Sequence, residues 1–278
     1  MNIIDFHTHA FPDALAPRAI AQLTINAAAS GYKPLTDGTI QGLIDSMDQA
    51  GINRSVVCNI ATNARQMTKV NDFAISCMQN NRLIPLGSLH PDASADEMDV
   101  ELDRLATAGL AGIKIHPDYV HVEIDSPVFE PILARCEARG MLVVTHAGFD
   151  PVEPEHIHCA PDMVLRILER HPALKLVVAH TGGFDCEREV LEKLCGKNVY
   201  LDTSLAAVRN DRSFAWGALC GDILRAHDQN KILFATDTPW SDPTAEIAFV
   251  RNLGLPDETV EKMLHENAER LLASCIKC

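Results

Sequence analysis

The sequence predicts an α/β protein built as a (β/α)8 TIM barrel, and two observations favour this fold class. First, eight short apolar runs rich in β-branched residues alternate with longer amphipathic stretches, and strands separated by helices assemble as parallel βαβ units. Second, the chain has 278 residues, close to the roughly 250 that an eight-unit barrel needs. Because no low-complexity run or Pro/Ser-rich linker marks a boundary, we expect a single domain over residues 1–278.

Each predicted strand is a short run whose residues suit burial on both faces, as parallel strands require. The run Leu174–Ala179 is almost continuously apolar, and the turn-forming pair Asn80-Asn81 precedes the third strand. In chain order, the predicted strands are Ile3–His7, Arg54–Asn59, Leu83–Leu89, Ala111–His116, Leu142–His146, Leu174–His180, Val199–Thr203 and Ile232–Thr236.

Amphipathic segments between these runs predict the helices. They are Val70–Asn81, Ala95–Ala108, Pro127–Arg139, Pro161–Arg170 and Cys186–Leu194. Gly51, Gly109 and Gly140 each stand between a helix and the next strand, where a left-handed residue commonly ends a helix.

Two segments fall outside the regular alternation. Residues 13–40 are less periodic, and we expect an extended first βα loop that contains a helix and covers the site. The amphipathic segment Asp257–Ala273 predicts a C-terminal helix that closes the chain.

The charge and hydropathy of the chain exclude several classes of function. Its formal net charge is −14, whereas a nucleic-acid-binding protein needs a basic face. No run approaches the roughly 18 apolar residues of a membrane span, no secretory signal is recognisable, and nine irregularly spaced cysteines indicate reduced thiols. We therefore expect a cytoplasmic protein that acts on a small molecule, without nucleic-acid or membrane partners. A homo-oligomer is compatible with the sequence.

Histidines gather at the ends of the predicted strands. In the stretch 5–9, side chains two residues apart on an extended segment point to the same side, so His7 and His9 can bind one metal ion. A single His-x-His is a weak signal, but active sites of such barrels lie at the carboxyl ends of the strands, and further polar residues occur there. These are Lys114, His116, His146, His180 and Asp237.

This arrangement resembles the amidohydrolase superfamily, and most closely the amidohydrolase-related branch that contains metal-dependent hydrolases and aminocarboxymuconate-semialdehyde decarboxylase-like proteins. The resemblance covers essentially the whole chain. It is carried by Asp5–His9, Gly112–Pro117, Val144–Gly148, Val178–Gly183 and Phe234–Trp240. These segments are specific together, although none is specific alone.

The resemblance implies one divalent ion held by His7, His9, His146 and Asp237. These ligand types favour Zn²⁺, with Mn²⁺ or Fe²⁺ as alternatives. It also implies that Asp237 acts as a base on an activated water, and that His180 assists the water or polarises the substrate rather than binding the metal. General acid–base chemistry is consistent with these roles.

Two residues of the fourth strand have several interpretations. In some superfamily members a lysine on this strand is carboxylated and bridges two metals, which would make the site dinuclear. Alternatively, Lys114 contacts a substrate anion or pairs with a carboxylate, because an unpaired buried charge is costly. His116 faces the substrate or supports the ligands, or else its His-Pro step serves as a turn.

Residues beyond the seventh and eighth strands are further candidates. Thr203-Ser204 lies just beyond the seventh strand, and Trp240, beyond the eighth, either walls the pocket or anchors its loop. Arg209 and Arg212 could reach a substrate carboxylate, although arginines are also common on protein surfaces.

The main functional prediction is a metal-dependent hydrolase acting on an ester, lactone or amide of a small molecule. The alternative is a nonoxidative decarboxylase of a small carboxylic acid, which the same ligands would serve and which an arginine near the metal would favour. A non-enzymatic barrel is disfavoured, because a silent relative would be expected to lose His146 or Asp237, and both are present.

Overall fold

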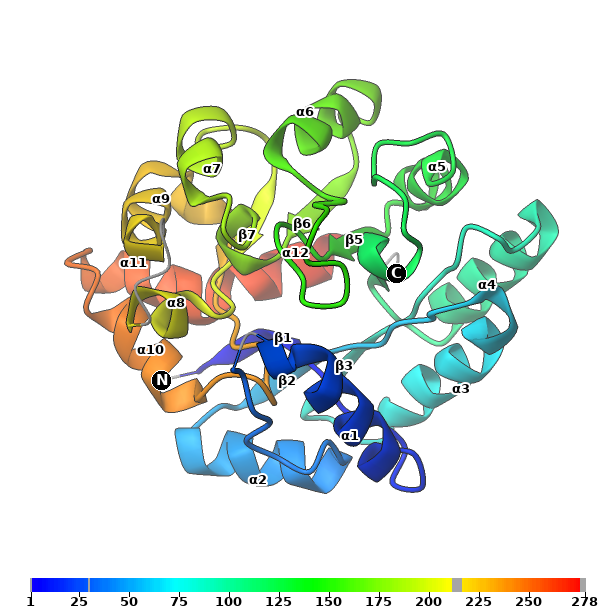
Figure 1. The fold of residues 1–278 in the computed structure, drawn as a ribbon, viewed down its shortest axis with the longest axis horizontal. Helices are drawn as coiled ribbons and strands as arrows, with labels where there is room; N and C mark the ends of the chain where they lie inside the picture. The colour runs from blue at the N-terminus through cyan, green and yellow to red at the C-terminus, as the bar shows by residue number, and fades with distance from the viewer. Residues whose placement is uncertain (1, 30, 212–216, 276–278) are drawn as a thin grey trace.

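The computed structural model describes residues 2–29, 31–211 and 217–275, and its centre is a ring of parallel strands surrounded by helices (Figure 1). Each strand overlaps one of the eight predicted runs, so the predicted (β/α)8 barrel is confirmed. The strands are β1 (Ile4–Thr8), β2 (Arg54–Cys58), β3 (Leu83–Leu86), β4 (Gly112–Ile115), β5 (Leu142–Thr145), β6 (Lys175–Val178), β7 (Tyr200–Asp202) and β8 (Ile232–Leu233).

Backbone hydrogen bonds across two seams close the barrel. Strands β1 to β3 form one parallel sheet, and β4 to β8 form another. At the first seam, the amide of Lys114 donates to the carbonyl of Gly87 at 2.8 Å. At the second, the amide of Phe6 donates to the carbonyl of Phe234 at 2.8 Å. The carboxyl ends of all eight strands therefore meet at one end of the barrel.

Helices follow the strands around the outside, and the predicted ones are found with ends shifted by a few residues. The α-helices are α1 (Ala16–Asn26), α2 (Ile40–Ala50), α3 (Met67–Cys77), α4 (Ala95–Thr107), α5 (Glu130–Arg139), α6 (Pro161–Arg170), α7 (Glu187–Lys193), α8 (Ala206–Asp211), α9 (Cys220–Ala226), α10 (Pro243–Arg251), α11 (Asp257–Glu261) and α12 (Asn267–Cys275). Short 3-10 turns span Ala27–Ala29, Ala64–Gln66, Pro117–Tyr119, His180–Gly182, Gly217–Leu219 and Gln229–Lys231.

Local signals set several helix ends as expected. Gly51 and Gly140 end α2 and α5 in the left-handed conformation, with φ of 73° and 66°, which glycine adopts without a Cβ clash. Ser94 begins α4 through a reciprocal capping box with Glu97.

The two segments outside the alternation take the predicted forms. Helix α1 lies in the long connection between β1 and α2, and it lines the pocket at the barrel end. The C-terminal helix runs from α11 through a π turn, Lys262–Glu266, into α12. Within that turn the carbonyl of Met263 accepts the amide of Phe234 at 2.9 Å. The C-terminal helix is thereby attached to β8.

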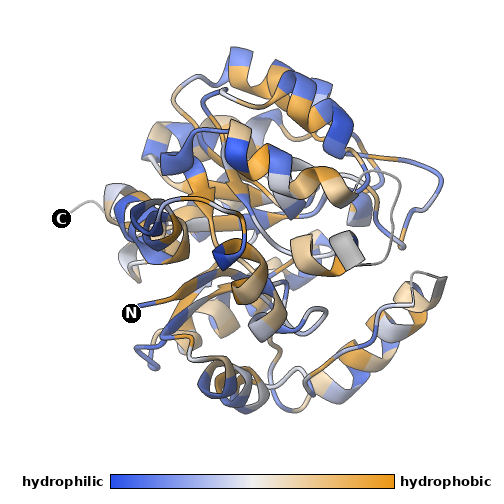
Figure 2. Cartoon of the chain, turned by 90° about the vertical axis from the view of Figure 1, so that its left-hand side faces the viewer, coloured by the Kyte–Doolittle hydropathy of each residue, from blue (hydrophilic) through white to orange (hydrophobic). Residues whose placement is uncertain are grey.

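The interior of the barrel is apolar below the site. Phe6, Val144 and Val177 pack there against Leu271 of α12. In Figure 2 the central strands are coloured mainly as hydrophobic, whereas the helices around them show both colours. Among the described residues, no helix combines the length and apolar character needed to cross a membrane.

Strand β1 breaks its alternation where the site begins. Its pairing with β2 shifts register between Asp5 and Thr8. In a regular strand, consecutive side chains point to opposite faces. Here both Phe6 and His7 point into the barrel: Phe6 packs in the core, and His7 contacts Lys114 on β4. An irregularity of this kind re-aims a side chain next to a functional site.

Candidate metal centre and active site

The strand ends open into a cavity of about 720 Å³. Among the described candidates, Thr203, Ser204 and Arg209 do not line it, whereas the others do: His7, His9, Lys114, His116, His146, His180, Asp237 and Trp240. Residues of α1 and α3 complete the lining above them. The fold therefore brings together side chains from five strands at one polar floor beneath a covering helix.

His7 and His9 converge on Asp237. Oδ1 of Asp237 lies 3.1 Å from Nε2 of His9 and 3.6 Å from Nε2 of His7. Bonds of about 2.0–2.1 Å in a tetrahedral zinc site separate neighbouring ligand atoms by about 3.3–3.4 Å. Both distances suit ligands of one ion, and the three ligand atoms lie within 4.8 Å of one another.

The hydrogen bonds of Nδ1 in both rings leave Nε2 as the nitrogen on the side of the site. Nδ1 of His9 donates to the carbonyl of Cys58 at 3.0 Å, and Nδ1 of His7 contacts the Asp202 carboxylate at 2.9 Å. In the neutral rings, Nε2 then carries a lone pair directed at Asp237. A lone pair facing a carboxylate is stabilised by a cation between them, so the donor set fits a divalent metal.

The electrostatics favour the metal-binding forms. Burial, followed by the charge of Lys114, lowers the pKa of His7. Burial opposes ionisation of Asp237, but its contacts with His9 and His7 and the charge of Lys114 lower its pKa. Neutral imidazoles and an ionised carboxylate are the species that bind divalent ions.

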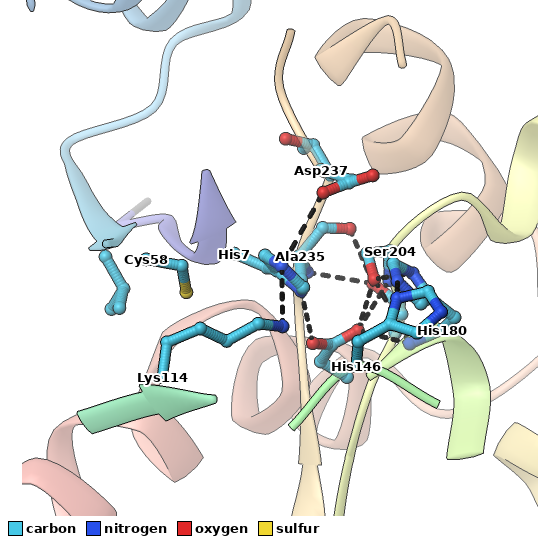
Figure 3. Close-up of polar contacts among 12 residues, drawn as sticks. His7, Cys58, Lys114, His146, His180, Ser204, Ala235 and Asp237 are labelled. Carbon is cyan, nitrogen blue, oxygen red and sulfur yellow. Dashed lines mark hydrogen bonds and ion pairs between the residues drawn. The ribbon is translucent and has the colours of Figure 1, made fainter. Parts of the chain in front are cut away.

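Lys114 supplies a positive charge at the same place. Its side chain is 1% exposed, and Nζ lies 3.2 Å from Nε2 of His7; Figure 3 shows His7 between Lys114 and Asp237. Among the described residues, no carboxylate oxygen lies within 4.0 Å of Nζ. Because Nε2 of His7 has one lone pair, metal binding requires this ammonium to turn away or to become a carbamate ligand.

His180 is held by a chain of hydrogen bonds. Nδ1 lies 2.8 Å from the hydroxyl of Ser204, and Nε2 lies 3.0 Å from Nδ1 of His146. Burial and the neighbouring histidines hold the pKa of His180 well below its usual value. His180 lines the cavity as a neutral imidazole, but both of its nitrogens already have partners.

Asp202 is a site residue that the sequence analysis missed. Its Oδ2 contacts His7, while Oδ1 accepts the amides of His180 and Ser204 at 3.0 and 3.1 Å. The carboxylate is fully buried at the end of β7. The signal in the sequence that could have identified Asp202 is an acidic residue at the end of an otherwise apolar strand.

His146 lies in a second cluster of polar side chains. Its ring stacks on that of His116 with centroids 4.3 Å apart, and Nε2 lies 3.7 Å from Oδ2 of Asp150 and 3.9 Å from Oδ2 of Asp118. Neither nitrogen of His146 faces Asp237 in this structure. Its role as a fourth ligand therefore stays a prediction, and Asp118 and Asp150 were not among the predicted site residues.

A model of the Amidohydro_2 family, described as amidohydrolase, matches residues 4–273. This covers nearly the whole chain and agrees with the resemblance carried by the strand-end motifs. The chain belongs to this amidohydrolase family. None of the curated proteins matches its sequence significantly.

Solved structures share the fold of this amidohydrolase. The uncharacterised TIM-barrel protein Bb4693 from Bordetella bronchiseptica is 20% identical, covers both chains fully and has a TM-score of 0.76. The 5-carboxyvanillate decarboxylase LigW from Sphingomonas paucimobilis is 17% identical over 98% of this chain and 99% of its own, with a TM-score of 0.72. A 5-carboxyvanillate decarboxylase from Novosphingobium aromaticivorans, solved with manganese and a nitrobenzoic acid, is 17% identical over 98% and 96%, with a TM-score of 0.68.

Arg209 of the amidohydrolase is not placed to contact a substrate, which corrects the sequence-based interpretation. The side chain is fully buried; Nη1 pairs with Glu187 at 2.9 Å and donates to the carbonyl of His180 at 3.0 Å. Arg209 instead supports the backbone behind His180, because a guanidinium with several donors can bridge elements that a loop brings together. Arg212 lies outside the described residues, and Trp240 lines the pocket.

Proposed function

We propose that this amidohydrolase is a metal-dependent, nonoxidative decarboxylase of a small aromatic or unsaturated carboxylic acid. The bond between carbon and the carboxyl group breaks, CO₂ leaves, and a proton replaces it on the carbon. This was the alternative prediction from the sequence, and it is favoured here over hydrolysis.

The observation that carries the proposal is the environment of Lys114. Its buried ammonium has no carboxylate partner within 4.0 Å among the described residues and borders the cavity. Leaving such a charge unpaired in the interior is costly. A substrate carboxylate would supply the missing partner, whereas an ester, lactone or amide is uncharged at its reacting group.

The walls of the cavity suit an aromatic body. Aromatic rings of Phe73, Phe149, Phe184 and Trp240 line it, and rings of this kind bind planar apolar ligands face to edge or offset. Two of the structures that share the fold are 5-carboxyvanillate decarboxylases. Their substrate class and the pocket chemistry point in the same direction.

His116 is the group suited to deliver the proton. Although burial opposes it, contacts with Asp118 and Asp150 raise the pKa of His116. The ring lines the cavity, with Nδ1 3.4 Å from Asp118 and Nε2 3.5 Å from Asp150. A protonated imidazole is a competent general acid near neutral pH.

His7, His9 and Asp237 would hold the divalent ion, with His146 as the fourth ligand implied by the family resemblance. When bound, the ion supplies Lewis-acid polarisation of substrate oxygens and fixes their orientation. The ligand types suit Zn²⁺, whereas the Novosphingobium structure contains manganese. Both metals are candidates for this chain.

Hydrolysis stays the second candidate because of Asp237. Its carboxylate is ionised and lies beside two histidine ligands, which is the position of a base acting on an activated water. In that reaction Asp237 accepts a proton, whereas decarboxylation needs a donor and uses His116.

A substrate screen in H₂¹⁸O separates the two reactions. Protein loaded separately with Zn²⁺ and Mn²⁺ is offered benzoic and muconate-like acids beside esters, lactones and amides. The proposal expects CO₂ release from an acid, and His116→Gln should reduce that release while metal content is unchanged. Incorporation of ¹⁸O into the product of an ester, lactone or amide, with no CO₂ from any acid, would return the assignment to hydrolysis.

A further inference from the structure

The mouth of the cavity is built from one face of each of two helices. From α1 and the residue before it, the cavity is lined by Leu15, Arg18, Ala19, Gln22, Leu23 and Asn26. From α3 and the residue before it, the cavity is lined by Gln66, Lys69, Val70 and Phe73. Spacings of three and four residues place each set on one side of its helix. Each helix therefore presents one stripe, made of the lining residues named above, to the cavity.

Each stripe contains one exposed cation. Arg18 and Lys69 are exposed, and within the described parts of the chain neither has a carboxylate oxygen within 4.0 Å. The acidic residues of the lining are engaged deeper in the site: Asp237 with His9 at 3.1 Å, and Asp150 with His116 at 3.5 Å.

Arg18 and Lys69 thus place two positive charges at the mouth, in a chain whose formal net charge is −14. A cleft lined by one sign of charge attracts ligands of the opposite sign and raises their association rate. The guanidinium of Arg18 can form two parallel hydrogen bonds to a carboxylate, while the ammonium of Lys69 is a flexible point charge.

Between the mouth and the floor the wall is apolar. Leu23, Val70 and Phe73, on the same two helices as the cations, contribute apolar side chains to the lining. The cavity, about 720 Å³, falls among pockets of roughly 300–1,000 Å³ that enclose drug-sized ligands. It offers room for a body longer than one carboxylated ring.

We infer that Arg18 and Lys69 form a second anion subsite, and that the substrate is an elongated molecule with two anionic groups. One carboxylate lies at Lys114 on the floor, an apolar body crosses the wall, and the second anionic group is held at the mouth. The inference rests on the proposed function only for the identity of the reacting carboxylate.

Binding to the metal-loaded full chain tests the subsite. Calorimetric titration compares two matched pairs: benzoate with terephthalate, and biphenyl-4-carboxylate with biphenyl-4,4′-dicarboxylate. In at least one pair the dianion should bind roughly threefold to tenfold more tightly, as expected for solvent-exposed ion pairs, and added salt should reduce the difference. The double variant Arg18→Gln/Lys69→Gln should remove the preference and leave monoanion binding within about twofold.

Arg54→Gln/Lys197→Gln is the matched control. Arg54 begins β2, Lys197 precedes β7, and both are exposed at the opposite end of the barrel and absent from the cavity lining. This variant makes the same change in net charge and should keep the dianion preference.

The subsite would be refuted if the wild-type chain bound monoanions and dianions equally tightly. It would also be refuted if Arg54→Gln/Lys197→Gln lost the dianion preference as fully as Arg18→Gln/Lys69→Gln. If CO₂ is released from monoacids while the dianion preference is missing, only the subsite fails. If the preference is present and no acid releases CO₂, only the proposed decarboxylation fails.

Discussion

The carboxylate of Asp202 joins His7 to His180: Oδ2 lies 2.9 Å from Nδ1 of His7, and Oδ1 accepts the amide of His180 at 3.0 Å. Ser204 extends this link, because its hydroxyl contacts Oδ1 of Asp202 at 2.5 Å and Nδ1 of His180 at 2.8 Å. One buried group on β7 thus orients a metal-ligand candidate on β1 and a histidine after β6.

Asp202→Asn should weaken metal binding by about 10- to 100-fold, because partners of this kind orient a ligand and raise its basicity. Competition with a chromogenic chelator measures the affinity. Ser204→Ala removes the contact to His180 and keeps the one to His7, so its metal affinity should stay near the wild-type value. Equal losses in the two variants would contradict the separate role assigned to Asp202.

The protein should bind one divalent ion per chain, and His7→Ala should empty the site, because Nε2 of His7 lies 3.6 Å from Asp237 and supplies the ligand lone pair once Lys114 turns away from it. Elemental analysis after purification without chelator gives the stoichiometry. His146→Ala is also expected to lose the ion. If it retains the ion, His146 belongs with Asp118 and Asp150 instead, and two ions per chain would indicate a carboxylated Lys114.

If the reaction is hydrolysis, His180→Asn and Asp237→Asn should each lower turnover by about 10²–10⁴-fold, the usual contribution of an acid–base group, with smaller effects on metal content. Both side chains line the cavity, and His180 is neutral and hydrogen-bonded to His146. Steady-state kinetics at saturating metal make the comparison. Complete metal loss in His180→Asn would make His180 a ligand.

Arg209→Ala should destabilise the fold by about 3–5 kcal/mol, because it leaves Glu187 as an uncompensated buried carboxylate. Both side chains are fully buried and 2.9 Å apart. Urea denaturation monitored by fluorescence gives the free energy of unfolding. Adding Glu187→Gln should recover part of the loss, and a single variant within about 1 kcal/mol of wild type would refute the buried pair.

Glu246 should make the fold less stable as pH rises. Burial raises the pKa of Glu246 from 4.5 to about 8, while its carboxyl contacts the Ser241 hydroxyl at 2.6 Å and the Ala207 amide at 2.9 Å. Above about pH 4.5 the unfolded chain releases this proton, and the folded chain keeps it until about pH 8. Within that window the free energy of unfolding falls by up to about 1.4 kcal/mol per pH unit from this group.

Glu246→Gln keeps the same shape without the titration, so its free energy of unfolding should depend less on pH between about 5 and 8. Denaturation curves at several pH values, compared with those of the wild type, provide the measurement. Glu155→Gln changes an exposed carboxylate and serves as the control. If the free energy of unfolding of Glu246→Gln depended on pH as strongly as that of the wild type, the carboxyl of Glu246 would be ionised in the folded chain over this whole pH range.

The sequence by itself determined the barrel and the residues at its strand ends. Strand and helix periods are local, and closure of eight parallel strands brings their carboxyl ends to one place, so His7, His9, His146 and Asp237 could be assigned to one end of the barrel from the sequence. The end of α2 at Gly51 was equally local, because it depends on the conformational freedom of one residue.

Only the tertiary structure decided the partners of these residues. Asp202 meets His7 across 195 positions of sequence, Asp118 and Asp150 gather around His116 and His146, and Arg209 turns inward to Glu187. No local pattern encodes such pairs, since a hydrogen bond between distant segments depends on strand register and side-chain direction after the barrel has closed. The positions of the strand ends show where the site lies. The packing of the closed barrel determines which side chains form hydrogen bonds and ion pairs with one another there.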